Sequence, residues 1–417
     1  MKALGRPFWR LYASSATSNL ADGIGRTALP LLAASYTRSP IAVAGLFTFA
    51  FLPWLLFALP SGALVDRIDR RYAMCGANTL RALAMGALAV LVFRHEGDVV
   101  LLYVVSFVLG LAETVYDSAT RALLPQVISD DRLDAANSLL TVEETLGQTF
   151  LGAPVGSALF ALAAAIPIVL NAGGFVIAAL LVLTLRGNFR PVRAEAPTSV
   201  RHDIADGVRW LVAHRFLRDL TLISAATALV QMMANGVLVL YVLEVLRLPS
   251  GDFGYVLLVA GVGALIGGVT TPKLAQWFGR GVMLTVGSFV TATATALMAL
   301  TRNGVVGAAL FAAAAAGVMV WNVLTMSLRQ SLIPHELFGR VQGAYRTLVW
   351  GAIPLGALLG GALASALGIR AVFAITGVGL FALAGVLGVL VRIHREVLSG
   401  EAGGASDVEA AYEPVSR

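Results

Sequence analysis

The sequence predicts an all-α integral membrane protein with twelve transmembrane helices in two pseudo-symmetric six-helix bundles and with both termini in the cytoplasm. Three observations predict this class: the composition, the spacing of the apolar stretches and an internal repeat. Of the 417 residues, 58% are hydrophobic and 13% are charged, whereas soluble domains carry about 25% charged residues. Because so much apolar surface would not dissolve in water, we interpret the chain as embedded in a lipid bilayer.

The apolar stretches give the number of spans. A helix needs about 20 mostly apolar residues to cross a bilayer, and six such stretches occur on each side of a polar segment between Arg186 and Arg218. The first stretch is too long for the apolar core of a signal peptide, so we interpret it as a retained span. The predicted spans are 8–36, 40–64, 72–94, 98–124, 136–162 and 165–187, then 217–247, 251–274, 280–301, 304–330, 341–365 and 367–393.

The spans divide the chain into four predicted segments. In the polar segment Ile204, Val208 and Leu211 recur at helical spacing, which favours a helix lying on the cytoplasmic membrane face; an ordinary solvated linker helix is the alternative. The C-terminal residues have low hydrophobicity, which is typical of disorder. The segments are an N-terminal bundle (1–187), a cytoplasmic linker with an amphipathic helix (188–216), a C-terminal bundle (217–395) and a disordered cytoplasmic tail (396–417).

The basic residues predict the orientation. Most of the 30 lysines and arginines lie at the termini or in the loops after even-numbered spans. That side is therefore cytoplasmic, which places both termini inside a cell membrane. The net charge of +6 does not indicate a nucleic-acid partner, because the basic residues sit in short loops. The opposite side carries Arg38, Arg94, Arg247, Arg302 and Arg370.

An internal repeat relates the two halves. Residues 64–74 (LVDRIDRRYAM) resemble residues 274–284 (LAQWFGRGVML), and residues 122–140 resemble residues 327–345 at nearly the same separation. Both pairs follow equivalent spans of the two halves. Six spans, a linker and six spans again are the plan of transporters whose halves rock about a central site.

The loop after the second span carries the most specific motif. The run from Gly62 to Arg71, GALVDRIDRR, resembles the loop motif of the major facilitator superfamily, and the resemblance extends over residues 8–395. It implies a gating role for Gly62, Asp66 and Arg70, which would brace the two halves on the cytoplasmic face in the outward-facing state. Asp69 departs from the family pattern, which usually has a second glycine at this place.

The fifth span carries a second motif. Its glycines and proline are similar to those of proton-coupled antiporters in the superfamily, although Ala153 interrupts the usual Gly-Pro step. The strings SNLADGIGRTALPLL and LGLAETVYDSATRALLP resemble the bacterial branch of macrolide-efflux and siderophore-export permeases. These resemblances imply an antiporter that exports its substrate. The antiporter-like residues are Gly147, Gly152, Pro154 and Gly156.

Three acids deep in predicted spans are the candidate proton-coupling residues: Asp22, Glu113 and Asp117. Each costs about 2.5–3.5 kcal/mol at the centre of an isolated span, so retained acids indicate a wet cavity or partners. Arg26 lies four residues after Asp22 on the same helix face, so the two can pair, and we expect Arg26 to be the counter-charge of a proton switch carried by Glu113 or Asp22. The alternative is that such pairs are static and only fix helix packing.

The second half offers uncharged or basic polar residues in place of deep acids. Amide and aromatic groups suit an amphipathic ligand, whereas plain packing is the alternative for each of them. The candidate substrate-cavity residues are Gln231, Asn235, Trp321, Asn322, Tyr345 and Arg346.

These observations predict a secondary active transporter. It exports a small amphipathic compound (a drug, a siderophore or a similar metabolite) by alternating access in exchange for protons, and works as a monomer. A uniporter or importer of a small nutrient and a transport-inactive receptor or scaffold of the same fold are the alternatives. The five histidines show no HExxH spacing, no GxxxxGK[ST] loop occurs and there is a single cysteine, so we expect no enzyme, cofactor or metal site.

Overall fold

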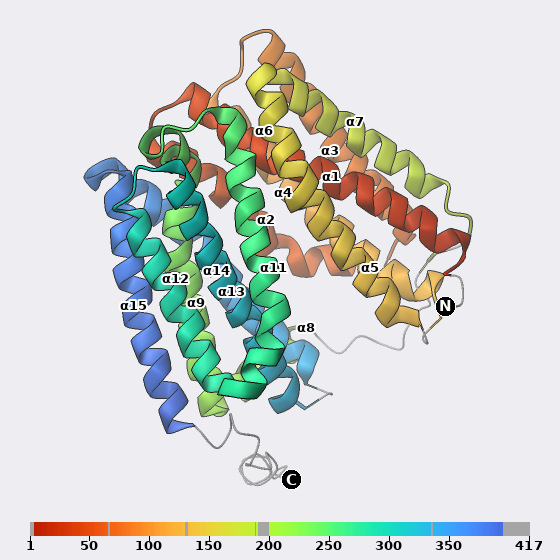
Figure 1. Ribbon diagram of the computed structural model, residues 1–417. Coiled ribbons are helices and arrows are strands. Elements are labelled where there is room, and N and C mark those ends of the chain that lie inside the picture. The colour runs from red at the N-terminus through yellow and green to blue at the C-terminus, as the bar shows by residue number, and fades with distance from the viewer. Residues whose placement is uncertain are drawn as a thin grey trace, which may run out of the picture. The chain divides into compact units, whose positions relative to one another are not determined.

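The structure is a computed structural model that describes residues 4–65, 67–129, 132–187, 189–190, 200–334 and 337–394. Throughout these ranges the regular elements are helices (Figure 1). Asp66 of the predicted gating motif and the predicted disordered tail, 396–417, lie outside the described residues.

The helices of the first half follow the predicted spans closely. The fifth span is continuous but changes its winding, because α5 leads through a π-helical segment, η2, into α6. The elements are α1 (Gly5–Tyr36), α2 (Pro40–Val65), α3 (Arg70–Phe93), α4 (Val99–Val127), α5 (Leu133–Thr145), η2 (Leu146–Gly152), α6 (Ala153–Leu162) and α7 (Ala165–Leu183).

The second half begins with the linker helix α8 and again follows the predicted spans. Its first span ends in a second π-helical segment, η3. The elements are α8 (Val200–Ala213), α9 (Arg215–Asn235), α10 (Leu238–Leu240), η3 (Tyr241–Val245), η4 (Ser250–Asp252), α11 (Phe253–Phe278), α12 (Arg280–Met298), α13 (Gly304–Leu332), α14 (Phe338–Leu367) and α15 (Ile369–Ile393).

Length and composition mark 11 helices of the described chain as able to cross a membrane. The long helix that is not among them is α1, which has 32 residues and so a length of about 48 Å at 1.5 Å per residue. It is long enough to span, but polar residues interrupt its apolar sequence. Several of these, including Ser14, Ser18 and Thr27, are buried, because α1 is covered by neighbouring helices.

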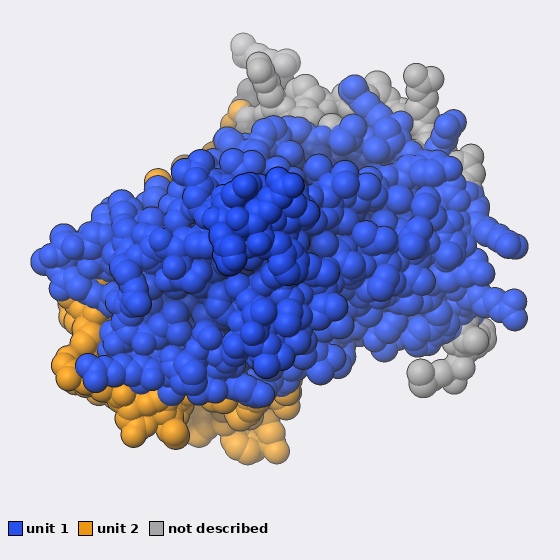
Figure 2. Space-filling view, turned by 90° about the horizontal axis from the view of Figure 1, so that it is seen from above, with its two compact units in different colours: residues 1–194, 235–258, 357–369 blue, residues 195–234, 259–356, 370–417 orange. Residues whose placement is uncertain are grey.

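The helices form two compact units (Figure 2). Unit 1 comprises residues 1–194, 235–258 and 357–369, and unit 2 comprises residues 195–234, 259–356 and 370–417. Each unit thus consists mainly of one half of the sequence, but two short segments of the second half, residues 235–258 and 357–369, belong to unit 1. The predicted domain limits at residues 187 and 217 stay a prediction.

In unit 1, α1 packs along α7, η2 and α6, while α3 packs against α4 and α7. The fifth span approaches α1 closely because its glycines face the α1 backbone. A Cβ on Gly156 would lie 2.7 Å from the Ile24 carbonyl oxygen, and a Cβ on Gly152 would lie 2.7 Å from the Gly23 Cα. An apolar cluster that includes Phe8, Met74 and Leu123 closes one end of this unit.

Second-half segments complete unit 1. The Ser157 hydroxyl of α6 donates to the Gly251 carbonyl at 2.9 Å, and Gly254 leaves no room for a Cβ beside Ala153. Arg38 and Glu244 form an ion pair of 3.3 Å. In the predicted orientation these contacts all lie at the non-cytoplasmic ends of the helices.

In unit 2 the linker helix α8 docks on the bundle. Trp210 and Leu211 are buried in a cluster with residues of α9, α12, α13 and α14, and Gly207 lies against the backbone of Arg340. Val208 is exposed, so the predicted apolar face of this helix is only partly covered by protein. Contact of α8 with the membrane face stays a prediction.

Candidate functional site

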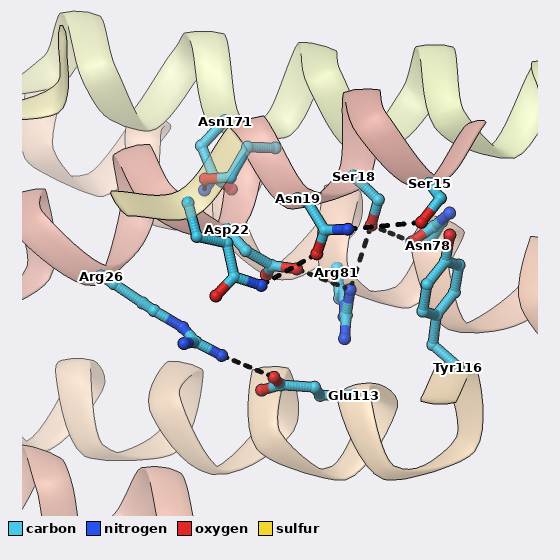
Figure 3. Close-up of polar contacts among 12 residues, drawn as sticks. Ser15, Ser18, Asn19, Asp22, Arg26, Asn78, Arg81, Glu113, Tyr116 and Asn171 are labelled. Carbon is cyan, nitrogen blue, oxygen red and sulfur yellow. Dashed lines mark hydrogen bonds and ion pairs between the residues drawn. The ribbon is translucent and has the colours of Figure 1, made fainter. Parts of the chain in front are cut away.

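One face of α1 carries the polar residues of the site. Ser15, Ser18, Asn19, Asp22 and Arg26 follow one another at spacings of one, three and four residues, which places them along one side of a helix. Figure 3 shows their side chains directed toward α3 and α4, with Asn171 of α7 on the other side. The sequence of α1 thus supplies a polar stripe to the interior of unit 1.

The first ion pair of the site joins α1 to α4. Arg26 Nη2 lies 2.7 Å from Glu113 Oε1, and the two side chains are 56% and 23% exposed. Such a short charge-assisted hydrogen bond is among the stronger polar contacts in proteins. Since its arginine is largely exposed, this pair is accessible from outside unit 1.

The second ion pair corrects the prediction for Asp22. Asp22 Oδ2 pairs with Arg81 Nη1 of α3 at 3.3 Å, so the predicted pairing with Arg26 is wrong. The reason is that Arg26 extends across to α4, while Arg81 is enclosed, with 1% of its side chain exposed. A buried guanidinium needs an anion beside it, and Asp22 is the carboxylate that α1 places there.

Arg81 and the residues around it were not among the predicted site residues. Arg81 Nη1 donates to Ser18 Oγ at 3.3 Å, and its guanidinium lies 5.2 Å from the ring centres of both Tyr116 and Phe175. Ser18 also donates to Asn78 Oδ1 at 3.3 Å. The available signal was an arginine in the middle of the predicted span 72–94, one turn after an asparagine.

A third set of contacts ties α1 to the fifth span. Asn19 Nδ2 donates to Glu143 Oε1 at 2.9 Å, and Gln148 Nε2 donates to Asn19 Oδ1 at 2.8 Å. Glu143 is buried, whereas Glu144 is exposed. Gln148 lies in the π-helical η2 together with Gly147 and Gly152, and π-helical turns often occur at functional sites. Of the other antiporter-like residues, Pro154 lies in the first turn of α6.

The remaining predicted residues of the first half lie apart from these pairs. Asp117 is half-buried on α4, one turn after Glu113, and makes no hydrogen bond or ion pair with the described residues. Arg70 Nη1 donates to the Ala122 carbonyl at the end of α4 at 2.8 Å. Gly62 has open space around its Cα. The bracing of two halves by this motif stays a prediction.

Asp69, the residue that departs from the family pattern, has a clear local role. Its carboxylate accepts from the Arg71 N–H at 2.9 Å and from the Phe189 N–H at 3.4 Å. It therefore caps the start of α3 and holds the buried Phe189, which follows the sixth span, against unit 1.

Unit 2 contains a cavity of about 110 Å³ among α9, α12, α13, α14 and α15. Four of the six predicted cavity residues line it: Gln231, Trp321, Asn322 and Tyr345. Arg346 instead lies over the Trp350 ring at 4.1 Å, and Asn235 falls in unit 1. The structure thus brings four candidates together, while their contact with a substrate stays a prediction.

Arg329 lies behind the cavity and was also missed. Its guanidinium carbon is 3.7 Å from the centre of the Tyr345 ring, the residue is 8% exposed, and among the described residues its Nε and Nη1 have no hydrogen-bond partner. Its only signal in the sequence was an arginine just inside the end of the predicted span 304–330. Within the described ranges no group of three or more His, Cys, Asp or Glu residues could hold a metal ion.

Two relatives that resemble the chain over nearly its whole length are named as efflux proteins. The multidrug efflux pump Tap of Mycolicibacterium fortuitum is 27% identical over 412 residues, which cover 94% of this chain and 97% of the pump. Macrolide efflux protein A of Streptococcus pyogenes is 22% identical over 396 residues, which cover 93% of this chain and 96% of that protein.

Solved structures share the fold. The nucleoside transporter NupG is similar with a TM-score of 0.76 at 11% identity, covering 93% of this chain and 99% of NupG. A bacterial homologue of the iron transporter ferroportin, in its inward-facing state, has a TM-score of 0.72 at 18% identity, covering 93% and 99% of the two chains. The family model described as transmembrane secretion effector matches residues 5–403. The chain therefore belongs to the transmembrane secretion effector family, within the efflux branch of the major facilitator superfamily of membrane transporters.

Proposed function

We propose that this protein exports a small amphipathic compound, such as a drug, a siderophore or a similar metabolite, by alternating access in exchange for protons. It works as a monomer in the cell membrane. Support for export comes from the two efflux proteins, which resemble the chain over nearly its whole length. The substrates named for them are multiple drugs and macrolides, both compatible with an amphipathic ligand.

We further propose that α1 is the twelfth span and that both termini are cytoplasmic. The length of α1 is sufficient, and its polar side chains are used in contacts with α3, α4, α5 and η2. A helix whose polar groups are satisfied by protein does not need an apolar surface all round. The distribution of basic residues in the loops supports the orientation.

The Arg26–Glu113 pair is the observation that carries the proton-exchange proposal. A carboxylate that exchanges protons needs a route to water and a partner it can release. Glu113 has both, since Arg26 is largely exposed and sits on a different helix. The Asp22–Arg81 pair is enclosed and acts as a structural support for α1. Glu113 is thus the proton site, and Asp117 is a second carboxylate one turn closer to the cytoplasm.

In this mechanism Glu113 alternates between two states. Paired with Arg26 it is ionised, and when a substrate or a movement of α1 draws Arg26 away it takes up a proton. Proton binding on one side and release on the other would couple the gradient to export. The exchange requires only these two side chains and water.

The test is flux of a labelled macrolide in proteoliposomes with an imposed pH gradient, on wild type and Glu113→Gln. We expect the variant to lose gradient-driven flux while it retains exchange of labelled for unlabelled macrolide without a gradient. Glu244→Gln is the matched control, because it breaks another Arg–Glu pair, of 3.3 Å, that lies outside the site; it should behave as wild type.

Each alternative gives a different result. Flux through wild type that ignores the pH gradient would indicate a uniporter, and gradient-driven accumulation in the opposite direction would indicate an importer. Absence of flux across a panel of drugs and siderophores would favour the receptor or scaffold. Full gradient-driven flux in Glu113→Gln would refute the role of this carboxylate.

A further inference from the structure

The cavity of unit 2 has a chemistry that narrows the class of its ligand. We infer that it binds an uncharged ring bearing several hydroxyl groups, such as a sugar ring, as one part of the exported compound. This inference rests on the proposed export function, but it concerns binding and can be tested without transport. It follows from the hydrogen-bonding state of the lining residues, their charge and the size of the cavity.

Three hydroxyl groups of the lining can only accept hydrogen bonds from a ligand. Ser224 donates to the Leu220 carbonyl and Ser288 to the Leu284 carbonyl, each at 2.8 Å. Thr291 donates to the Gly287 carbonyl at 3.0 Å and lies 3.3 Å from the Ala314 carbonyl of α13. A hydroxyl has a single hydrogen and two lone pairs, so these hydrogens are used by carbonyl groups of the protein and the lone pairs remain. A ligand that satisfies them must bring O–H or N–H donors.

Two amides add to the polar lining, which also includes the hydroxyl groups of Thr227 and Tyr345. The side chains of Gln231 and Asn322 line the cavity, and neither is hydrogen-bonded to another described residue. Each offers one carbonyl oxygen and two N–H donors. A hydroxyl group is both donor and acceptor, so a ring with several hydroxyls matches this mixture of acceptors and amides.

The charges around the cavity disfavour ionic ligands of either sign. The described residues that line it carry no charged side chain. Behind Tyr345, at 3.7 Å from its ring centre, lies the buried guanidinium of Arg329, with which no carboxylate of the described chain pairs. This cation repels an ammonium group, and because Arg329 does not itself line the cavity, it offers an anionic oxygen no direct hydrogen bond. Arg329 is in addition a positioning residue, because its guanidinium lies over the ring of Tyr345.

The size and apolar surface of the cavity fit one ring. Its volume of about 110 Å³ compares with about 30 Å³ for a water molecule in the liquid, and a 150 Å³ cavity can hold benzene. Trp321, Leu380 and Leu383 supply apolar surface, which covers the C–H face of a sugar or the face of an aromatic ring. The cavity therefore holds about one ring of a ligand, and the remainder of a larger molecule would lie outside it.

The experiment uses cysteine protection. The single cysteine of the chain, Cys75, is replaced by serine, and Ser288→Cys places a thiol in the cavity. The alkylation rate by N-ethylmaleimide is measured in nanodiscs with three probes: 4-nitrophenyl glucopyranoside, its tetra-O-methyl ether and the 2-amino-2-deoxy analogue, which carries an ammonium group. Thr285→Cys, on the same helix but outside the lining, is the matched control.

We expect the neutral glucoside to slow alkylation of Ser288→Cys and to leave Thr285→Cys unchanged. The methylated ether lacks donors and should protect about tenfold more weakly, and the ammonium analogue should be similarly weak. Asn322→Leu and Gln231→Leu should each reduce protection by the glucoside by about tenfold. Arg329→Met should raise protection by the ammonium analogue relative to the glucoside, which a purely structural role would not do.

Three results would overturn the inference. Equal protection by the glucoside and its methylated ether would remove the requirement for donors. Stronger protection by the ammonium analogue would reverse the charge argument, and no protection by any probe would exclude the cavity as a binding site. Because alkylation needs no gradient, loss of flux in proteoliposomes would refute export while leaving this result intact.

Discussion

Replacing Arg81 by methionine should destabilise unit 1 far more than the same change at Arg26. Both arginines pair with a carboxylate of the site, at 3.3 Å for Arg81 and 2.7 Å for Arg26. They differ in burial, since 1% of the Arg81 side chain is exposed against 56% for Arg26. Distance alone would rank Arg26 as the more important residue, so the comparison isolates the effect of burial.

The expected magnitudes follow from this difference. Removing one partner of a buried pair costs about 3–5 kcal/mol because the other charge is left without compensation. Removing one partner of an exposed pair costs about 0.2–1 kcal/mol. For a unit of about 200 residues, 1 kcal/mol shifts the unfolding temperature by about 2–4 °C. Arg81→Met should therefore lower it by roughly 6–20 °C, and Arg26→Met by at most about 4 °C.

The measurement is thermal unfolding of the purified protein in detergent, followed by tryptophan fluorescence. Asp22→Asn in the Arg81→Met background removes the orphaned charge and should recover at least half of the lost stability. Equal shifts for Arg81→Met and Arg26→Met would refute the argument from burial. A double variant as unstable as Arg81→Met would show that Asp22 is not the partner that matters.

Two further predictions concern stability. Burial lowers the pKa of His214 below its ordinary value of 6.5, and its neutral Nδ1 accepts from the Leu217 N–H at 3.3 Å to cap α9. The contribution of His214 to stability should thus be constant above pH 6.5 and fall as the pH drops from there toward the lower pKa of the folded state. His214→Asn, which keeps a capping acceptor, should flatten this dependence in unfolding scans between pH 5 and pH 8. An unchanged profile would exclude His214 as its cause. Gly156→Ala should cost about 1–3 kcal/mol, since its Cβ would lie 2.7 Å from the Ile24 carbonyl oxygen, whereas Gly86→Ala, with nothing within 4 Å, should be neutral or stabilising. The same thermal scan compares them, and similar shifts would contradict the close packing of α6 on α1.

The helices could be predicted because apolar length is a direct property of the sequence. The predicted span 304–330 corresponds to α13, which begins at Gly304 after Asn303 caps it and ends at Leu332. The predicted end at residue 330 falls two residues short of Leu332, because the polar run Arg329, Gln330 and Ser331 ends the apolar stretch before the helix itself ends. Helix ends in a membrane protein extend past the apolar stretch, and hydrophobicity does not report that extension.

The ion pairs could be predicted only in part. That Asp22, Arg26 and Glu113 need partners follows from the cost of a charge in lipid. Which partner each takes depends on the rotation of α3 and α4 about their axes, and no periodicity in the sequence specifies it. The i to i+4 spacing of Asp22 and Arg26 allows the two residues to pair within α1, but each of them pairs with a residue of another helix instead.

The residues that line the cavity could likewise be predicted only in part. Gln231 and Asn322 stand out as amides in apolar helices, so the sequence indicates them. Ser224, Ser288 and Thr291 do not stand out, because small hydroxyl residues are common in spans where they bond to the preceding turn. Their value to a ligand depends on which lone pairs face the cavity, and this is visible only once the helices are assembled.

The polar stripe of α1 has a consequence for biosynthesis. Beside the stripe, the Ala21 carbonyl accepts from the Asn171 side chain and Ser14 donates to the Ala178 carbonyl, so these partners on α7 leave the ribosome 150 and 164 residues after the α1 residues that they contact. At about 5–20 residues per second, α1 waits roughly 8–30 s for them. During that interval the helix least suited to lipid needs a protected place beside the insertion machinery, and mutations that delay α7 should expose it to degradation.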